Sequence, residues 1–309
     1  MIKKVYILTL FLLLMLSVNA VFAQQDSVTK ATMTLQDQSL STENRIKMAV
    51  AIIDKAITHS ECIHNGYAWY VRGFIYKEWY KNLDSQNKKS KIRLDAVEYL
   101  MKAHELFKTD TSSAALEFSD SNNKTIKYLG STFYNDAGFF LDPSNYTTAI
   151  EYNEKFKECW LLADPNYNPK SREIEFKCAL ATVYEKIFRS NIKMQSQFYG
   201  MTEILYKQVI ALDSNNWSGN YNLAMLYYNF GVDIINSMKV EEDIVVVDNI
   251  QEDSRVLFKK ALPYALKAEL LKPHKREVLE CLRGIYFSLY EFDKSDEYKV
   301  KIAMLDKDK

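Results

Sequence analysis

The side chains that most often do chemistry are few and scattered in this sequence. The four histidines are His59, His64, His104 and His274. None of them lies in an HExxH motif or at zinc-ligand spacing from a cysteine. The chain contains neither a GxxxxGK[ST] phosphate loop nor a GxSxG nucleophile motif. We therefore predict that the protein is not an enzyme, that it uses no cofactor and no metal, and that its histidines lie at the surface or at helix caps.

The four cysteines leave two interpretations open. They are Cys62, Cys159, Cys178 and Cys281, widely spaced and without a CxxC motif. All four fit as small buried residues of helix cores. Alternatively, Cys159 late in one predicted helix meets Cys178 early in the next and forms a disulfide, which an oxidising compartment would permit.

The composition predicts that helices are the secondary-structure elements that position any functional site. The chain has 309 residues with only 8 Gly and 5 Pro, which indicates long helices joined by short loops. Ala261, Ala265 and Ala268 share one helical face, Pro273 follows that helix, and bulky residues at helical spacing open the next one at Leu279. A small-faced helix, a proline turn and a bulky-faced helix are typical of the tetratricopeptide repeat (TPR).

Parts of the same repeat motif recur along the chain. Trp69-x2-Arg72-Gly73-x2-Tyr76 matches the first-helix pattern of the repeat with one substitution, and the glycine is expected at a close helix contact. Further first-helix patterns begin at Leu129, Leu180 and Asn220. We predict an all-α, TPR-like α-solenoid of antiparallel helix pairs over residues 44–309. Residues 110–123 are expected to form a loop, and residues 241–249 a loop insertion whose apolar side chains tuck against the helices.

The N-terminus has the pattern of a secretory signal peptide over residues 1–23. Lys3 and Lys4 precede an apolar run at 5–18, and Val21-Phe22-Ala23 is a small-x-small cleavage site with no lipid-accepting cysteine after it. The alternative is an uncleaved anchor, but the run is shorter than the ~20 residues that a membrane span needs. We therefore expect a periplasmic or secreted protein, and we expect residues 24–43, which are polar and aperiodic, to be a flexible leader.

The charge balance bears on the class of partner. Lysine plus arginine and aspartate plus glutamate are both 40 in the full chain, and removing Lys3 and Lys4 leaves 38 against 40. Nucleic acids and anionic membranes select proteins with a basic surplus, so neither is an expected partner. The oligomeric state is left open.

The sequence also resembles a known family. The segments YNLAMLYYNFGVDIIN (221–236), LFKKALPYALKAELLKP (257–273) and REVLECLRGIYFSL (276–289), together with AWYVRGFIYKEWY (68–80), are similar to exported TPR proteins of Bacteroidota. The resemblance is stronger at the two ends of residues 66–309 than in the middle. It implies a periplasmic or secreted α-solenoid that binds protein and brings no catalytic residue with it.

If the solenoid binds a ligand, the first helix of each pair should line its concave face. Counting along each first helix from the Trp69 position selects six aromatic and methionine residues for that groove. They are Tyr70, Phe74, Tyr134, Tyr221, Met225 and Tyr228. Such side chains suit a protein or peptide partner. The alternative function is a carbohydrate-binding component of an outer-membrane nutrient-uptake assembly, and the alternative role for the rings is packing between helices.

Overall fold

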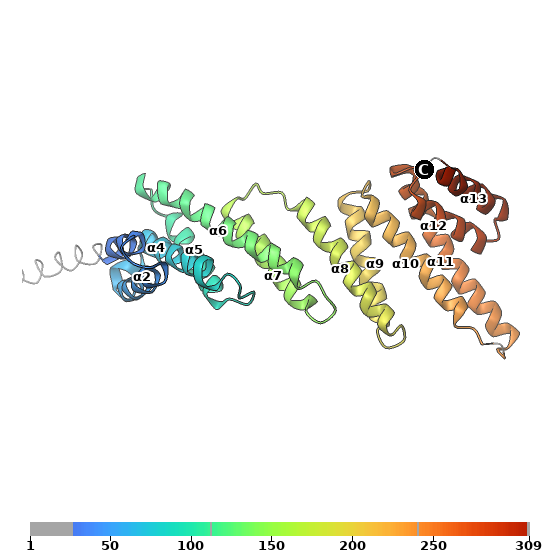
Figure 1. The fold of residues 1–309 in the computed structure, drawn as a ribbon, viewed down its shortest axis with the longest axis horizontal. Coiled ribbons are helices and arrows are strands. Elements are labelled where there is room, and N and C mark those ends of the chain that lie inside the picture. Colours follow the sequence, from blue (N-terminus) through green and yellow to red (C-terminus); the bar gives the residue numbers. More distant parts are fainter. Residues whose placement is uncertain (1–26, 112, 240, 308–309) are drawn as a thin grey trace, which may run out of the picture. The chain divides into compact units, whose positions relative to one another are not determined.

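The computed structural model describes residues 27–111, 113–239 and 241–307, and these residues form helices without a β-strand. The predicted signal peptide, residues 1–23, lies outside them. The chain packs as two compact units, one containing residues up to 140 together with 147–167 and the other 141–146 together with 168–309. Figure 1 shows the helices of each unit in chain order.

Unit 1 is built from helices that pack on their neighbours in sequence. Its elements are a helix at residues 27–36, α2 (Thr42–Ala56), α3 (Ser60–Ile63), α4 (Gly66–Trp79), a π-helical turn η1 (Tyr80–Asp84), α5 (Lys91–Phe107), α6 (Ser113–Phe139) and α7 (Tyr146–Ala163). The first residue of α7, Tyr146, is counted with unit 2, and the rest of that helix belongs to unit 1. Helix α4 pairs with α5, while α6 packs against both of them.

Polar side chains fix where the helices of unit 1 begin. Ser41 accepts a hydrogen bond from the Asn44 backbone N–H at 3.3 Å and caps α2. Asn65 caps α4 in the same way, and Ser90 caps α5. Each cap satisfies a backbone donor that has no partner within its own helix.

The glycine of the Trp69 motif brings α4 and α5 together. A β-carbon added at Gly73 would lie 2.6 Å from Cγ of Leu100, closer than real side chains approach. Leu100 is fully buried. The prediction that this glycine serves close helix packing is therefore confirmed.

A buried ion pair joins α5 to α6. Arg93 is fully buried, and its Nη1 lies 2.6 Å from Oδ2 of Asp136. Its guanidinium lies over the Phe133 ring at 4.0 Å and donates to the backbone carbonyl of Lys88 at 2.8 Å. Lys88 also contacts Asp136, at 2.8 Å from Oδ1. The charge of Asp136 is thus shared between two cations.

Two expectations about unit 1 are wrong. The predicted leader is helical at residues 27–36, where Val28 and Ala31 are buried in the same apolar cluster as Ile53. The helix forms because this packing stabilises a segment that is otherwise polar. The loop expected at 110–123 instead contains the start of α6, which begins at Ser113.

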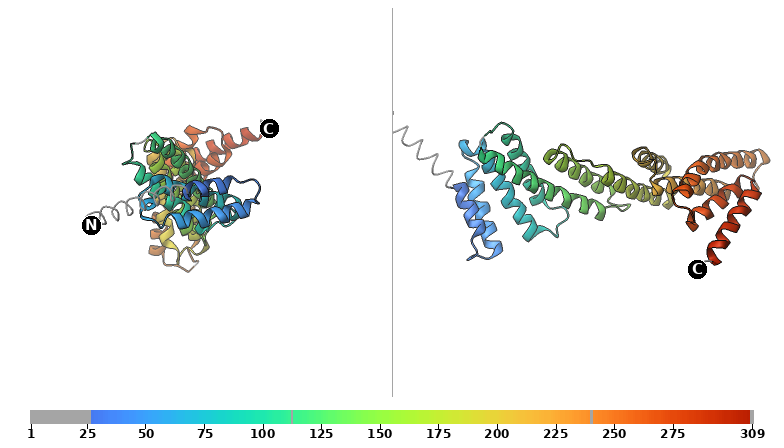
Figure 2. Two further views of the ribbon diagram at one scale, coloured as in Figure 1. Left: turned by 90° about the vertical axis from the view of Figure 1, so that its left-hand side faces the viewer. Right: turned by 90° about the horizontal axis from the view of Figure 1, so that it is seen from above.

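Unit 2 contains three helix pairs that follow one another along the chain. Its helices are α8 (Lys170–Ser190), α9 (Ser196–Leu212), α10 (Trp217–Asn236), α11 (Ile244–Leu271), α12 (Arg276–Ser288) and α13 (Phe292–Lys307). Helices α8 and α9, α10 and α11, and α12 and α13 form successive pairs. The right-hand view of Figure 2 shows the helices of this unit from above.

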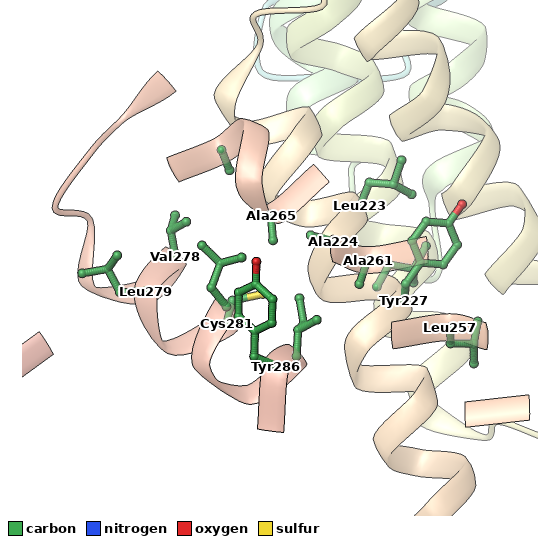
Figure 3. Packing of buried hydrophobic residues seen from close by; sticks show 14 of the residues in the cluster. Leu223, Ala224, Tyr227, Leu257, Ala261, Ala265, Val278, Leu279, Cys281 and Tyr286 are labelled. Carbon is green, nitrogen blue, oxygen red and sulfur yellow. The ribbon is translucent and has the colours of Figure 1, made fainter. Parts of the chain in front are cut away.

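The alanine face of α11 belongs to an apolar core cluster of unit 2. Ala261, Ala265 and Ala268 are all fully buried, as their spacing predicts. Figure 3 shows Ala261 and Ala265 between Leu223 of α10 and the bulky side chains of α12. Small side chains on the central helix let the helices on both sides approach it closely.

The loop insertion expected at 241–249 is wrong. Residues 244–249 form the first turns of α11, and Asp243 caps them by accepting from the Val245 N–H at 2.8 Å. The apolar side chains there do not tuck inward, since Ile244 is 69% exposed and Val245 is 63% exposed. The pairing of α11 with α10 stabilises this segment as helix despite its β-branched residues.

The predicted fold class is confirmed: the chain is an all-α, TPR-like solenoid of antiparallel helix pairs. Among its described residues, no helix has the length and apolar character needed to cross a membrane.

Candidate functional site

One of the six predicted groove residues lines a cavity. Phe74 on α4 borders a cavity of about 570 Å³ in unit 1. The other lining residues come from the end of the first helix, the turn after it, the start of α2, and the face of α4 that continues into η1. They are Leu35, Gln36, Gln38, Arg45, Ile46, Glu78 and Asn82.

The cavity combines an apolar part with hydrogen-bonding groups. Phe74, Leu35 and Ile46 provide the apolar wall, and the amides of Gln36, Gln38 and Asn82 each carry both a donor and an acceptor. Phe74, Glu78 and Asn82 are four residues apart, which places them along one face of the helix.

Electrostatic contacts hold the α4 side of the cavity in place. The Lys77 ammonium lies 3.8 Å from the centre of the Phe74 ring and forms an ion pair with Glu78. Burial lowers the pKa of Lys77, although its contact with Glu78 opposes that shift. Burial raises the pKa of Glu78, but the hydrogen bonds and charges of Lys77, together with the Asn82 amide, outweigh it and lower the pKa. Glu78 therefore presents a charged carboxylate beside the cavity.

The π-helical turn after α4 places the last lining residue. The Asn82 side-chain amide donates to the Glu78 backbone carbonyl at 2.8 Å and to the Glu78 carboxylate at 2.9 Å. These two bonds anchor the side chain within η1 and leave its carbonyl oxygen as an acceptor. π-Helical turns are often found at functional sites.

The other two candidates in unit 1 pack between helices. Tyr70 is half-buried, with its ring centre 5.8 Å from that of Phe118 on α6 and 6.0 Å from that of Phe74. Burial raises its pKa. Tyr134 is also half-buried, with its ring centre 4.9 Å from that of Phe156 on α7. Neither residue lines the cavity beside Phe74.

The three candidates in unit 2 lie along one side of α10 and pack on its core cluster. Tyr221, Met225 and Tyr228 are all half-buried against that cluster. The Tyr221 ring stacks on Trp217 at 5.0 Å and 7°, and burial raises its pKa to about 12. A β-carbon at Gly284 of α12 would lie 2.4 Å from the Tyr228 hydroxyl, so this ring occupies the space beside a glycine.

A second cavity lies in unit 2, and the sequence did not predict it. It measures about 500 Å³ and lies between the start of α8 and the turn from α9 to α10. Its lining residues are Asn168, Lys170, Ser171, Ile174, Glu175, Asp213 and Asn216. Asn216 accepts from the Gly219 N–H at 2.8 Å and caps α10, while Asn168 accepts from the Lys170 N–H at 3.0 Å. These amides are already used to begin helices.

The histidines and cysteines do not line either of these two cavities. His59, His64 and His274 are exposed, as predicted, while His104 is half-buried with its Nδ1 2.9 Å from the Asn123 side-chain oxygen. Within the described ranges, His, Cys, Asp and Glu side chains do not gather in threes that could hold a metal ion. All four cysteines are free thiols, and burial raises the pKa of Cys159 and Cys281 to about 12.

Comparison with known proteins gives similarities of structure only. No family model and no curated protein matches the sequence. The structure is similar to that of the nuclear import adaptor Nro1 of S. pombe, with 10% identity, a TM-score of 0.34, and coverage of 91% of this chain and 93% of that one. It is also similar to the C-terminal part of a TPR repeat-containing protein from Cytophaga hutchinsonii, with 15% identity, a TM-score of 0.30, and coverage of 90% of this chain and 95% of that one. Neither similarity names a ligand for this chain.

Proposed function

We propose that the protein is a non-enzymatic scaffold that binds an extended segment of a partner protein in the cavity beside Phe74. The observation that carries the proposal is the cavity itself, because a residue selected from the repeat pattern lines it. Its volume of about 570 Å³ lies within the ~300–1,000 Å³ range of ligand sites.

The lining of the cavity suits a polypeptide. An extended chain presents alternating N–H and C=O groups. The side-chain amides of Gln36 and Gln38 can pair with both, and the Asn82 carbonyl oxygen can accept from an N–H. Phe74 offers an apolar contact for one side chain of the partner. Arg45 and Glu78, one positive and one negative, would set the direction of the bound segment.

We also propose that the protein is exported and belongs with the TPR proteins of Bacteroidota that it resembles. The support is the signal-peptide pattern of residues 1–23 and the repeat motifs of residues 66–309. A formal net charge of zero favours protein over nucleic acid as the partner.

Carbohydrate binding is the second candidate function, and one observation favours it. The rings of Trp217 and Tyr221 are nearly parallel, at 7°, and the Lys272 ammonium lies 4.5 Å from the Trp217 ring. The negative face of an aromatic ring attracts the weakly positive C–H groups of a sugar. Both rings are half-buried and cover one another, which favours the peptide function instead.

A peptide-display selection tests the proposal. The protein is presented to a random peptide library, and the affinity of a recovered peptide is measured for the wild type, Phe74→Ala and Gln38→Ala. Phe139→Ala is the matched control, because Phe139 is a 66% exposed phenylalanine of unit 1 outside the cavity. We expect Phe74→Ala to weaken binding about tenfold or more, Gln38→Ala to weaken it less, and Phe139→Ala to leave it unchanged.

The opposite results are equally clear. A selection that yields no peptide, or peptides that bind Phe74→Ala and Gln38→Ala as tightly as the wild type, would exclude this cavity as the binding site. A glycan array read with the wild type and a Trp217→Ala variant would then show whether the carbohydrate alternative holds.

A further inference from the structure

A second surface of the protein is both apolar and strongly acidic. It consists of residues 241–256, which lead into and begin α11, and residues 287–297, which are the end of α12, the turn after it and the start of α13. We call it the acidic corner. The two segments contain ten acidic and two basic residues, a net charge of −8. Both cations are already paired, Arg255 with Glu252 at 2.9 Å and Lys294 with Glu291 at 2.6 Å.

One contact shows that the two segments of the corner are adjacent. The Arg255 guanidinium lies 5.8 Å from the centre of the Tyr290 ring, which places the end of α12 beside the middle of α11. Residues 244–254 therefore continue past the end of α12. In Figure 1 the start of α11 lies at the end of that helix that is away from α13.

Large apolar side chains are exposed throughout the corner. At the turn, Phe287, Tyr290 and Phe292 are 62%, 59% and 50% exposed, and their rings form one cluster with centres 5.5 and 6.1 Å apart. On α11, Ile244 and Val245 are 69% and 63% exposed. Exposed apolar groups gathered in this way and surrounded by charge are typical of interaction surfaces.

The backbone at Tyr290 adds a second observation. Tyr290 has φ 63°, a left-handed conformation that glycine or asparagine adopts at lower cost at the end of a helix. The chain therefore carries a strained, exposed aromatic residue where glycine would suit the fold better. An observed strain of this kind points to a role outside stability.

We propose that the acidic corner docks a basic amphipathic helix of a partner protein. The distance along α11 from Ile244 to Arg255 is about 16 Å, or roughly three helical turns. A partner helix of that length can place apolar residues on the aromatic cluster at one end and on Ile244 at the other. Its lysine and arginine side chains would then meet the carboxylates of the corner. The negative charge repels anionic lipid and nucleic acid, which leaves a basic protein segment as the occupant.

The probe for this proposal is a synthetic 18-residue peptide of leucine and lysine with leucine at helical spacing. Two matched peptides accompany it, one with the same composition in scrambled order and one with glutamate in place of lysine. We expect the first peptide to bind, with affinity that falls as salt is added, the scrambled peptide to bind about tenfold more weakly, and the glutamate peptide not to bind.

Variants of the protein identify the surface. A Phe287→Ser/Tyr290→Ser variant should weaken binding about tenfold or more. Asp248→Asn/Glu252→Gln, at two carboxylates on the side of α11 that carries Ile244 and Arg255, should weaken it several-fold with a smaller salt dependence. Leu270→Ser is the control, because Leu270 is an apolar residue of α11 that is 72% exposed outside the corner. Phe74→Ala should also bind normally, so failure of the cavity proposal and failure of this one are distinguishable.

The Tyr290→Gly variant tests whether the Tyr290 side chain serves peptide binding or the stability of the fold. We expect this variant to unfold at a temperature equal to or above that of the wild type, since glycine relieves the positive φ, and yet to bind the peptide more weakly. Equal binding by wild type and corner variants, equal binding of the scrambled peptide, or retention of the protein on anionic lipid vesicles in the same buffer would overturn the proposal.

Discussion

The guanidinium of Arg93 and the carboxylate of Asp136 lie 2.6 Å apart, with side chains that are 0% and 5% exposed. They join α5 to α6, and the rings of Phe133 and Tyr152 lie over the guanidinium, which is shielded from water. A buried charge of this kind is tolerated only while its partner is present.

We expect Asp136→Asn to lower the free energy of unfolding by about 3–5 kcal/mol, because it leaves the buried Arg93 cation without its counter-ion. Urea denaturation followed by circular dichroism measures the change. The double variant Arg93→Met/Asp136→Leu should be more stable than Asp136→Asn, since it removes both charges. Lys91→Met, which breaks an ion pair whose lysine side chain is 81% exposed, should change the stability little, because solvent screens that pair. A double variant that is less stable than Asp136→Asn would contradict this explanation.

Glycine-to-alanine substitutions should separate close packing from helix propensity. Gly73→Ala places a β-carbon 2.6 Å from Leu100 and should destabilise unit 1 by about 1–3 kcal/mol. At Gly138 of α6 a β-carbon meets nothing within 4 Å, so Gly138→Ala should stabilise the protein by about 0.5–1 kcal/mol. Thermal unfolding of the two variants provides the comparison. Equal effects of the same sign would show that the approach of α4 to α5 does not depend on the glycine.

The pH dependence of stability should report the burial of Tyr206. Burial raises the pKa of this phenol to about 12 in the folded protein, against about 10 for an ordinary tyrosine. Above pH 10 the unfolded chain releases this proton while the folded protein keeps it, so stability falls as pH rises. The contribution is up to about 1.4 kcal/mol per pH unit between the two pKa values. Tyr206→Phe should therefore show a shallower loss of stability above pH 10, and identical slopes would contradict the assignment.

Thiol labelling should distinguish the two interpretations of the cysteines. All four are free, and Cys178 is the one that is not fully buried. We expect four reactive thiols after unfolding without reductant, and in the folded protein slow labelling that begins at Cys178. Burial holds the thiols protonated and out of reach, which explains the slow reaction. Recovery of only two thiols would instead indicate a disulfide.

Much of the fold was predictable because small and bulky residues alternate between neighbouring helices. The spacing of Ala261, Ala265 and Ala268 identifies a buried face, and the Trp69 motif identifies the contact at Gly73. The helix at residues 27–36 was missed because only Val28 and Ala31 of it are buried, which is too sparse a pattern for periodicity to detect.

The candidate site was predictable in part. Counting along α4 selects Phe74, and continuing by four and eight residues along the same face would have added Glu78 and Asn82. Gln36 and Gln38 could not be found this way, since they belong to a segment whose structure depends on tertiary packing. In unit 2 the same count selects residues such as Tyr228 that fill the space between α10 and α12 instead.

The pairing of helices with their neighbours in sequence also has a kinetic consequence. Helices α4 and α5, α8 and α9, α10 and α11, and α12 and α13 each find their main partner within a few tens of residues. Closing such short loops costs little chain entropy, so each pair can form without waiting for distant parts of the chain. Folding can therefore nucleate at more than one helix pair and spread to the adjoining helices. During synthesis, which proceeds from the N-terminus, the first helix pairs can fold before the last helices have been made.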